Sequence, residues 1–312
     1  MIVVLGPTAS GKTALAARLA YRLGAEVISA DSRQVYRGMD IGTGKDYADY
    51  VVNGQQVPVH LVDIVNAGYR YSVYDYQRDF KRVLVDLRQR GKLPVVCGGS
   101  GLYIESVLRA YKLIRVPVNH AFRQSMEGKS MDELASMLSS CRKLHNITDI
   151  TSRKRLIRAL EIEQWYETHP SAGEEFPAVR PLVIGIMVDR DTRRNNISRR
   201  LKNRMDEGMV EEVRALAAQG VDMETLVYYG LEYKYLAYYL TGELSFDEMY
   251  RSLETAIHRF AKRQMTWFRG MERRGIFIHW INGTLAQEQM LNEIIALYQD
   301  KTDENHREPI IM

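Results

Sequence analysis

Short apolar runs alternate with longer amphipathic stretches along this chain, a pattern typical of α/β proteins. The runs at residues 2–5, 26–29, 93–97 and 182–188 are rich in Val, Ile and Leu and predict buried strands of a parallel sheet. A further strand is predicted from His60 to Val65. Helical patterns lie between these runs, so the sequence indicates a parallel sheet flanked by helices.

The middle of the chain breaks this alternation. From Leu102 to about Thr168 the pattern is helical and polar, with an amphipathic helix from Arg153 through Trp165. Three prolines between Pro170 and Pro181 then predict a loop. We therefore expect one core built from residues 1–111 and 182–312, interrupted by a small helical insertion domain at 112–181.

The start of the chain reads as strand, glycine loop and helix, the last predicted over residues 14–23. The loop is Gly6-Pro-Thr-Ala-Ser-Gly-Lys-Thr13, which fits the phosphate-binding P-loop pattern of nucleotide-binding proteins. In this pattern backbone N–H groups and a helix N-terminus hold phosphate oxygens, the lysine adds a cation, and the final hydroxyl binds Mg²⁺. The sequence therefore predicts a phosphate or diphosphate site with magnesium on a P-loop NTPase-like core.

Two further strands end near this loop in the predicted sheet. Asp31 follows the strand at 26–29, at the carboxyl edge where such sheets place ligands. It could accept a hydrogen bond from a magnesium-bound water, act as a general base, or simply cap a turn. The strand at 93–97 ends at Gly98 and carries no terminal aspartate, which argues against an ATP-hydrolysing motor or switch.

Composition restricts the class of protein. The 312 residues are 46% hydrophobic and 26% charged, as in an ordinary globular protein, which excludes collagen-like, disordered and coiled-coil chains. Two cysteines are too few for a disulfide framework, and Cys97 is expected in the core. The seven histidines are scattered, so we expect no zinc site. Without a targeting segment or a long apolar run, a cytoplasmic protein with no membrane contact is predicted.

Positive charge is concentrated although the net charge is only +4. Residues 190–204 carry seven Arg or Lys and one Asp, and residues 251–274 carry seven Arg or Lys and two Glu. Such stripes suit a polyanion partner, although solvated helix faces would produce the same pattern.

The second stripe lies on a long predicted helix. The capping box Ser245-Phe-Asp-Glu248 opens this helix, which is expected to end near Arg269, before Gly270. Its basic and aromatic side chains include Arg259, Lys262, Arg263, Trp267 and Phe268. Interleaved cations and rings suit a nucleic acid, but the rings could instead pack in the core beneath snorkelling cations. For the tyrosines between 228 and 239, core packing is favoured over base stacking.

Five motifs in order give the chain a family resemblance. They are Gly6-Pro-Thr-Ala-Ser-Gly-Lys-Thr13, Asp31-Ser-Arg-Gln-Val-Tyr-Arg-Gly-Met-Asp-Ile-Gly-Thr43, Gly98-Gly-Ser-Gly-Leu-Tyr103, Lys154-Arg-Leu-Ile-Arg-Ala-Leu-Glu161 and Lys262-Arg-Gln-Met-Thr-Trp-Phe-Arg269. Over nearly its whole length the sequence closely resembles the tRNA dimethylallyltransferases, also called tRNA isopentenyltransferases. The resemblance implies transfer of a dimethylallyl group from dimethylallyl diphosphate to N6 of adenosine 37, beside the tRNA anticodon, with release of diphosphate.

The resemblance also implies roles for residues. Asp31 matches the general base, Lys12 and Arg200 stabilise the leaving group, and Thr13 binds Mg²⁺. Diphosphate contacts are implied for Gly6, Pro7, Thr8, Ala9, Ser10, Gly11, Lys12, Thr13 and Arg200. Contacts with the tRNA anticodon stem-loop are implied for Asp31, Ser32, Arg33, Gln34, Ser100, Arg123, Lys154, Arg155, Leu156, Ile157, Arg158, Lys262, Arg263, Gln264, Trp267 and Arg269. A monomer is expected.

Some residues depart from the family pattern, and other functions stay open. Gly44-Lys45-Asp46 replaces a frequent Ala-Lys-Pro, and residues 116–151 fit the insertion pattern poorly, which bears on the choice of tRNA. The alternatives are an adenylate isopentenyltransferase acting on free nucleotides, a small-molecule kinase with residues 190–204 as a lid, and a tRNA-binding protein without catalysis. The basic helix disfavours the first alternative, and ATP consumption would indicate the second.

Overall fold

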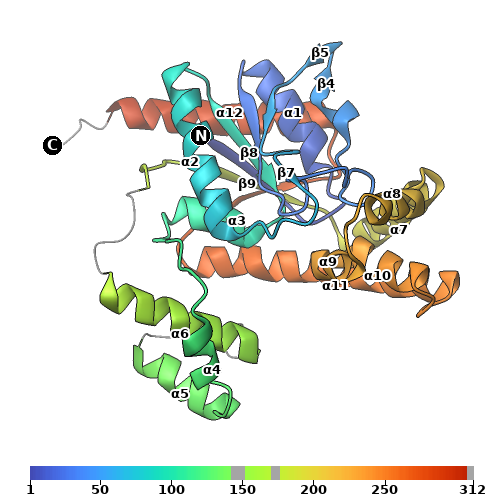
Figure 1. The fold of residues 1–312 in the computed structure, drawn as a ribbon. Coiled ribbons are helices and arrows are strands. Elements are labelled where there is room, and N and C mark those ends of the chain that lie inside the picture. Colours follow the sequence, from blue (N-terminus) through green and yellow to red (C-terminus); the bar gives the residue numbers. More distant parts are fainter. Residues whose placement is uncertain (142–151, 170–175, 308–312) are drawn as a thin grey trace. The chain divides into compact units, whose positions relative to one another are not determined.

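The computed structural model describes residues 1–141, 152–169 and 176–307 (Figure 1). The chain divides into two compact units, which we call the core unit (Met1–Ala110 with Pro177–Met312) and the insert (Tyr111–Phe176). The core unit has a parallel sheet flanked by helices and the insert is helical, which confirms the predicted α/β class with a helical insertion.

The central sheet has six strands in the order β10-β9-β1-β8-β2-β6, and every neighbouring pair is parallel. The strands are β1 (Ile2–Leu5), β2 (Glu26–Ser29), β6 (Val59–His60), β8 (Pro94–Gly98), β9 (Leu182–Met187) and β10 (His279–Asn282). Val3 of β1 lies opposite Val96 and Val183 and is fully buried, as expected where helices cover both faces. Because all strands run the same way, their carboxyl ends share one edge.

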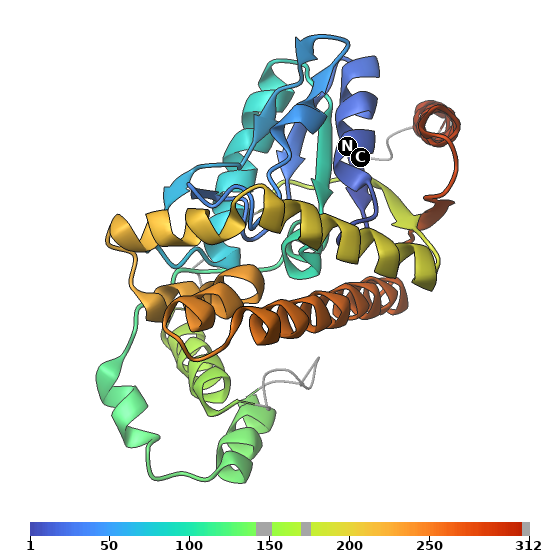
Figure 2. The ribbon, with the colours of Figure 1, turned by 90° about the vertical axis from the view of Figure 1, so that its right-hand side faces the viewer.

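Helices cover both faces of this sheet (Figures 1 and 2). α1 (Lys12–Arg22) and α12 (Gln287–Arg307) pack on one face, where Leu19, Leu291 and Ile294 join alternate strand residues in an apolar cluster. α2 (Val73–Gln89) packs against β2 on the other face and is followed along that face by α3 (Gly101–Leu108). Helix α1 begins at Lys12, two residues earlier than expected, so the P-loop lysine is already helical.

The segment between β2 and α2 departs from the expected single strand at 60–65. Leu61 and Asp63 have positive φ angles of 63° and 55°, so the extended conformation ends after His60. The segment instead contains β3 (Tyr36–Arg37) paired with β7 (Val65–Asn66), the 3₁₀ helix η1 (Tyr47–Tyr50), and the hairpin of β4 (Val51–Val52) and β5 (Gln55–Gln56). Asn53 and Gly54 join the hairpin with positive φ angles of 52° and 74°, as an Asn-Gly turn prefers.

The second half of the core unit is mostly helical. Besides α12, its helices are α7 (Arg190–Asp206), α8 (Met209–Ala218), α9 (Met223–Tyr229), α10 (Leu231–Leu240) and α11 (Phe246–Arg273). Figure 2 shows α7 and α11 side by side, and both contribute side chains to the cavity at the carboxyl edge of the sheet.

The capping box of α11 is confirmed, because Ser245 and Glu248 each bond the other's backbone N–H. The expected stop at Gly270 is wrong, since the helix continues to Arg273. Glycine at this buried position leaves space for Arg274, whose Nη1 would lie 2.9 Å from a Cβ at residue 270.

The insert contains α4 (His120–Ser125), α5 (Met131–Cys141) and α6 (Arg153–Thr168). Its small core is formed by Leu134, Leu138, Leu156 and Leu160, each at most 4% exposed. Leu134 and Leu138 are four residues apart on α5, as are Leu156 and Leu160 on α6, so each helix presents one apolar stripe to the other.

Candidate active site

The P-loop curls around the N-terminus of α1. Ala9 and Gly11 adopt positive φ angles of 60° and 77°, which turn the backbone into the helix. The Lys12 ammonium donates to the carbonyl of Pro7 at 3.4 Å. Burial lowers the pKa of Lys12, and the positive charges of Arg200 and Arg204 lower it further against the opposing effects of Cys97 and Asp31. A buried cation surrounded by other cations is a binding site for an anion.

Two side chains from distant helices hold this loop in place. The Thr8 N–H donates to Oε1 of Gln264 at 2.8 Å, and Nε2 of Gln264 donates to the carbonyl of Gly99 at 3.0 Å. Nδ2 of Asn196 donates to the carbonyl of Ala9 at 3.4 Å. Gln264, implied above to contact tRNA, is thus a buried bridge between the P-loop and the turn after β8.

The ends of β2 and β8 meet beside the P-loop. The Ser32 N–H donates to Oγ of Ser100 at 3.0 Å, and Oδ1 of Asp31 accepts from the Arg33 N–H at 2.9 Å. Gly98 makes this approach possible, because a Cβ there would overlap the Ala30 carbonyl. Among the hydrogen bonds that the structure describes, none involves the other oxygen of the Asp31 carboxylate.

These groups line one cavity of about 440 Å³ in the core unit. Of the residues predicted for the site, it brings together Thr8, Lys12, Thr13, Asp31, Ser32, Arg33, Gln34, Ser100, Arg200, Arg263 and Gln264. Helices α9 and α10 add residues that sequence reasoning did not assign to the site, including Tyr229, Glu232, Tyr233 and Lys234. The tyrosine cluster is split, because Tyr229 and Tyr233 are buried whereas Tyr228 is 46% exposed.

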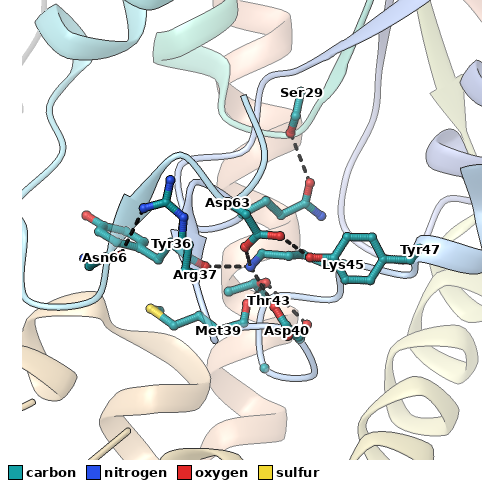
Figure 3. Close-up of polar contacts among 12 residues, drawn as sticks. Ser29, Tyr36, Arg37, Met39, Asp40, Thr43, Lys45, Tyr47, Asp63 and Asn66 are labelled. Carbon is teal, nitrogen blue, oxygen red and sulfur yellow. Dashed lines mark hydrogen bonds and ion pairs between the residues drawn. The ribbon is translucent and has the colours of Figure 1, made fainter. Parts of the chain in front are cut away.

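One wall of the cavity is the loop from Tyr36 to Asp46, and Lys45 anchors it (Figure 3). The Lys45 side chain is 1% exposed, and its ammonium donates to the Tyr36 carbonyl at 2.6 Å, to Asp40 at 2.7 Å and to Asp63. The Tyr47 hydroxyl also donates to Asp63. Figure 3 shows the Tyr36 carbonyl, Asp40 and Asp63 around the Lys45 ammonium, with Tyr47 bonded to Asp63.

Glu212 of α8 holds the same loop through hydrogen bonds to its backbone. Its carboxylate accepts the N–H groups of Asp40, Ile41 and Gly42 at 2.8, 2.6 and 3.0 Å, and the Tyr233 hydroxyl donates to it at 2.7 Å. Charge-assisted bonds to three successive N–H groups give the loop one conformation. The cavity wall at Gly42 to Gly44 is therefore held by hydrogen bonds within the protein.

Two arginines of α7 reach the cavity over this loop. Arg200 was expected there, and its Nη2 bonds Oδ2 of Asp46 at 2.6 Å. Arg204 was not assigned to the site, although its spacing of four residues from Arg200 places both on one helix face. This four-residue spacing is the feature of the sequence that could have placed Arg204 in the site.

A second hollow of about 330 Å³ lies on the other side of the P-loop. Ala9, Ser10 and Gly11 line it together with Thr13, Asp46 and Asp49. Burial raises the pKa of Asp49, and the neighbouring charge of Asp46 raises it further. Hydroxyl and carboxylate oxygens suit Mg²⁺. Within the described ranges, no three or more His, Cys, Asp or Glu side chains form a metal-binding group.

On α11 the basic and aromatic side chains separate. Lys262, Arg263 and Arg269 are exposed, whereas Phe268 is buried. Trp267, implied to contact tRNA, lies against Gly101, and its Nε1 donates to Glu105 at 2.9 Å. The rings therefore support the fold, and the cations are left at the surface.

The basic residues of the insert separate in a similar way. Arg123 and Arg158 pair with the buried Glu161 at 2.8 and 2.5 Å, whereas Lys154 and Arg155 are exposed. Ile157 is partly buried against the core of the insert. Leu156, implied to contact tRNA, has its side chain fully buried between α5 and α6, where it packs in the core of the insert.

Residues 34–271 match the family model for IPP transferase. The chain belongs to the IPP transferase family. A tRNA dimethylallyltransferase of Bacteroides fragilis is 57% identical over 94% of this chain and 95% of its own, and one of Parabacteroides distasonis is 58% identical over 93% and 95%. The comparison thus confirms the family that the five motifs indicated.

Solved structures of the family share the fold. The tRNA isopentenylpyrophosphate transferase of Bacillus halodurans is 30% identical and aligns with a TM-score of 0.69 over 98% of this chain and 99% of its own. A eukaryotic dimethylallyltransferase crystallised while acting on tRNA is 20% identical, and its TM-score is 0.76 over 100% of this chain and 81% of its own. The chain therefore has the fold of a tRNA prenyltransferase. Among the described helices, none has the length and apolarity needed to cross a membrane.

Proposed function

We propose that this family member transfers a dimethylallyl group from dimethylallyl diphosphate to N6 of adenosine 37 beside the tRNA anticodon. The observation that carries the proposal is the shared cavity of the core unit. It holds the carboxylate of Asp31 together with the cations Lys12 and Arg200. A base for the nucleophile and a cradle for the leaving group therefore face the same space.

The cations act on the leaving diphosphate. When the allylic C–O bond breaks, negative charge builds on the bridging oxygen, and Lys12 and Arg200 stabilise that charge as it forms. The N–H groups at the start of α1 point the positive end of the helix dipole at the same anion. Because the P-loop is already held by Gln264 and Asn196, little reorganisation is needed.

Asp31 acts on the nucleophile. As N6 forms its bond to the allylic carbon, the N–H becomes acidic, and Asp31 accepts the proton while the electrons of the breaking C–O bond leave with diphosphate. The target adenine must leave its stack to reach the cavity. The Ser32 N–H donates to Ser100 and the Arg33 N–H donates to Asp31. These two hydrogen bonds hold the segment after β2 that carries the Asp31 carboxylate.

Thr13, with Asp46 and Asp49 in the same hollow, would hold Mg²⁺. The ion supplies charge neutralisation for the diphosphate oxygens. Asp46 also pairs with Arg200, so it links the proposed Mg²⁺ site to the cavity that contains Asp31.

The exposed cations provide the path for tRNA. In the core unit these are Lys262, Arg263 and Arg269 on α11, and in the insert Lys154 and Arg155 at the start of α6. Phosphate contacts of this kind position a nucleic acid without reading its sequence. We further propose that the protein acts as a monomer.

The test is direct. Purified protein is incubated with dimethylallyl diphosphate, Mg²⁺ and unmodified tRNA, and the tRNA is digested to nucleosides for mass spectrometry. We expect N6-dimethylallyl adenosine in tRNAs that carry adenosine 37. Product on AMP without tRNA would indicate the adenylate enzyme, consumption of ATP would indicate a kinase, and no product with any tRNA would refute the proposal.

A further inference from the structure

Arg204 is a buried cation that the roles above leave unused. It lies on α7 one turn after Arg200, and both line the cavity that contains Lys12 and Asp31. The Arg204 side chain is 10% exposed, whereas the Arg200 side chain is 31% exposed. Burial lowers the pKa of Arg204, and the positive charge of Arg200 lowers it further. Burying a guanidinium destabilises the folded protein unless an anion compensates its charge.

The protein compensates Arg204 only in part. Its nearest acid is Glu232 of α10, and the Nη1 to Oε1 distance of 3.8 Å is too long for a hydrogen bond. Its Nη2 is buried and has no hydrogen-bond partner in the described structure. A buried charged donor without a partner is rare in folded proteins. The unused donor therefore points to a ligand that supplies the missing acceptor.

The surrounding backbone is shaped to admit this guanidinium. A Cβ at Gly44 would overlap Nη2 of both Arg204 and Arg200, so the two groups meet against the bare backbone of this residue. The φ angle of Gly44 is 65°, and Nε2 of Gln34 donates to its carbonyl at 3.1 Å. Since Lys45 and Glu212 fix the loop on both sides, the space is a built feature of the cavity wall.

We propose that Arg204 is a diphosphate-binding residue, whose Nη2 donates to the diphosphate of the allylic substrate beside Arg200 and Lys12. The inference rests on the proposed function, because it takes the anion in this cavity to be a diphosphate. The division of labour follows from the contacts. Arg200 is already bonded to Asp46 and is more exposed to solvent. The Nη2 of Arg204 has no partner among the described residues and is buried, and a charge-assisted hydrogen bond is stronger where water is excluded.

The experiment measures anion binding apart from catalysis. Magnesium pyrophosphate is titrated calorimetrically into the full-length wild-type protein, Arg204→Met, Arg204→Lys and Lys202→Met. Arg204→Met keeps much of the side-chain volume and removes the charge, and we expect pyrophosphate to bind about 10- to 100-fold more weakly. Arg204→Lys should recover part of this loss. Lys202→Met also replaces a cation with methionine, at an exposed position of α7, and should stay within about twofold of wild type.

A structural role for Arg204 predicts different results. If its function were only to face Glu232, Arg204→Met would lower the thermal midpoint of the ligand-free protein and leave pyrophosphate affinity unchanged. We expect the midpoint to hold, because methionine removes an unpaired buried donor. We also expect KM for dimethylallyl diphosphate to rise and KM for tRNA to stay unchanged. Should the methionine variant fail to fold, the titration of Arg204→Lys decides, with binding several-fold weaker expected.

The two proposals fail in distinguishable ways. If wild-type protein modifies tRNA and binds pyrophosphate but every folded Arg204 variant binds it equally well, the inference about Arg204 is wrong and the function stands. If wild-type protein neither binds pyrophosphate nor modifies tRNA, the proposed function itself is wrong.

Discussion

Each unit of the molecule contains a glutamate that faces arginine, Glu161 in the insert and Glu232 in the core unit, and the two sites differ in how fully the arginine charge is neutralised. In the insert, Arg123 and Arg158 both bond Glu161 within hydrogen-bonding distance. In the core unit, Arg204 lies 3.8 Å from Glu232, and its Nη2 has no hydrogen-bond partner among the described residues. The first arrangement uses its charges to hold the fold, and the second leaves charge available to a ligand.

The contrast shows why basic residues cannot be assigned to a ligand by type alone. Burial by itself raises the pKa of Glu161, but hydrogen bonds from Arg123, the Asn119 backbone and Arg158 outweigh it and lower the pKa to about 2. The pKa of Glu232 is raised, because burial exceeds the effect of the distant Arg204. The pKa shifts of Glu161 and Glu232 therefore have opposite signs, although each carboxylate faces an arginine.

The largest effect is expected at Asp31, whose charge acts on the substrate. Asp31→Ala should lower kcat by about 100- to 10,000-fold, the usual contribution of a general base, and leave tRNA affinity nearly unchanged. Asp31→Asn is the matched variant, since its amide oxygen can still accept from the Arg33 N–H. Single-turnover kinetics and filter binding check both. Full activity in either variant would show that another group takes the proton.

At Glu161 we expect a large effect on the fold. Glu161→Gln leaves two guanidinium groups without their counter-charge, and breaking such a buried pair costs about 3 kcal/mol. Hydrogen exchange should show the amides of α4 and α6 opening more often, while pyrophosphate binding in the core unit stays at the wild-type value. Glu167→Gln, exposed on the same helix, is the control. If pyrophosphate binding fell as well, the separation of roles between the units would be lost.

Acid should weaken the insert through the same carboxylate. The pKa of Glu161 is about 2 in the folded protein, below the value of about 4.3 for an unfolded chain, so its stabilisation is complete above about pH 5 and disappears as the pH falls towards about 2. Exchange rates of α6 amides at pH 5 and pH 3 check this, and Glu161→Gln should flatten the dependence. Equal dependence in both proteins would assign the effect to other groups.

A global melting curve would not isolate this effect. Hydrogen bonds from Arg90 and His60 to Glu26 of the core unit, opposed by burial, also lower the pKa of Glu26 to about 2. Acid therefore acts on both units at once, and only a local probe separates them.

The sequence predicts features that contiguous residues determine. The P-loop was predictable because the strand, the glycines and Lys12 form one uninterrupted segment, and the position of Asp31 followed from the edge that parallel strands share. The end of α11 was not, because continuation through Gly270 depends on Arg274 reaching Glu105 of α3. The break after His60 depends on positive φ angles at Leu61 and Asp63, and leucine rarely adopts such an angle, so its residue type does not predict the break.

The unpaired donor of Arg204 depends on residues that are far from it in the sequence. Its unpaired donor results from the length of the gap to Glu232, the absence of a side chain at Gly44 and the fixing of that loop by Glu212. These residues come from three segments that only the fold brings together. The charge pattern of the sequence places Arg204 in a basic stripe. Only the structure shows that, unlike the exposed cations of this stripe, it is buried with an unpaired donor among the described residues.

The smallest expected effect tests whether the exposed cations of the insert contact RNA. Lys154 and Arg155 precede the buried stripe of α6 and are exposed, whereas Arg123 is committed to Glu161. In the double variant Lys154→Gln with Arg155→Gln, the slope of log affinity for tRNA against log salt should shrink by roughly 1 to 2, one condensed ion for each lost phosphate contact. Exchange of the insert amides should not change. Arg123→Gln should show the reverse, faster exchange with a smaller change in slope. If both variants alter the slope equally, pairing with Glu161 does not withdraw Arg123 from RNA, and the contrast between committed and available arginines holds only in the core unit.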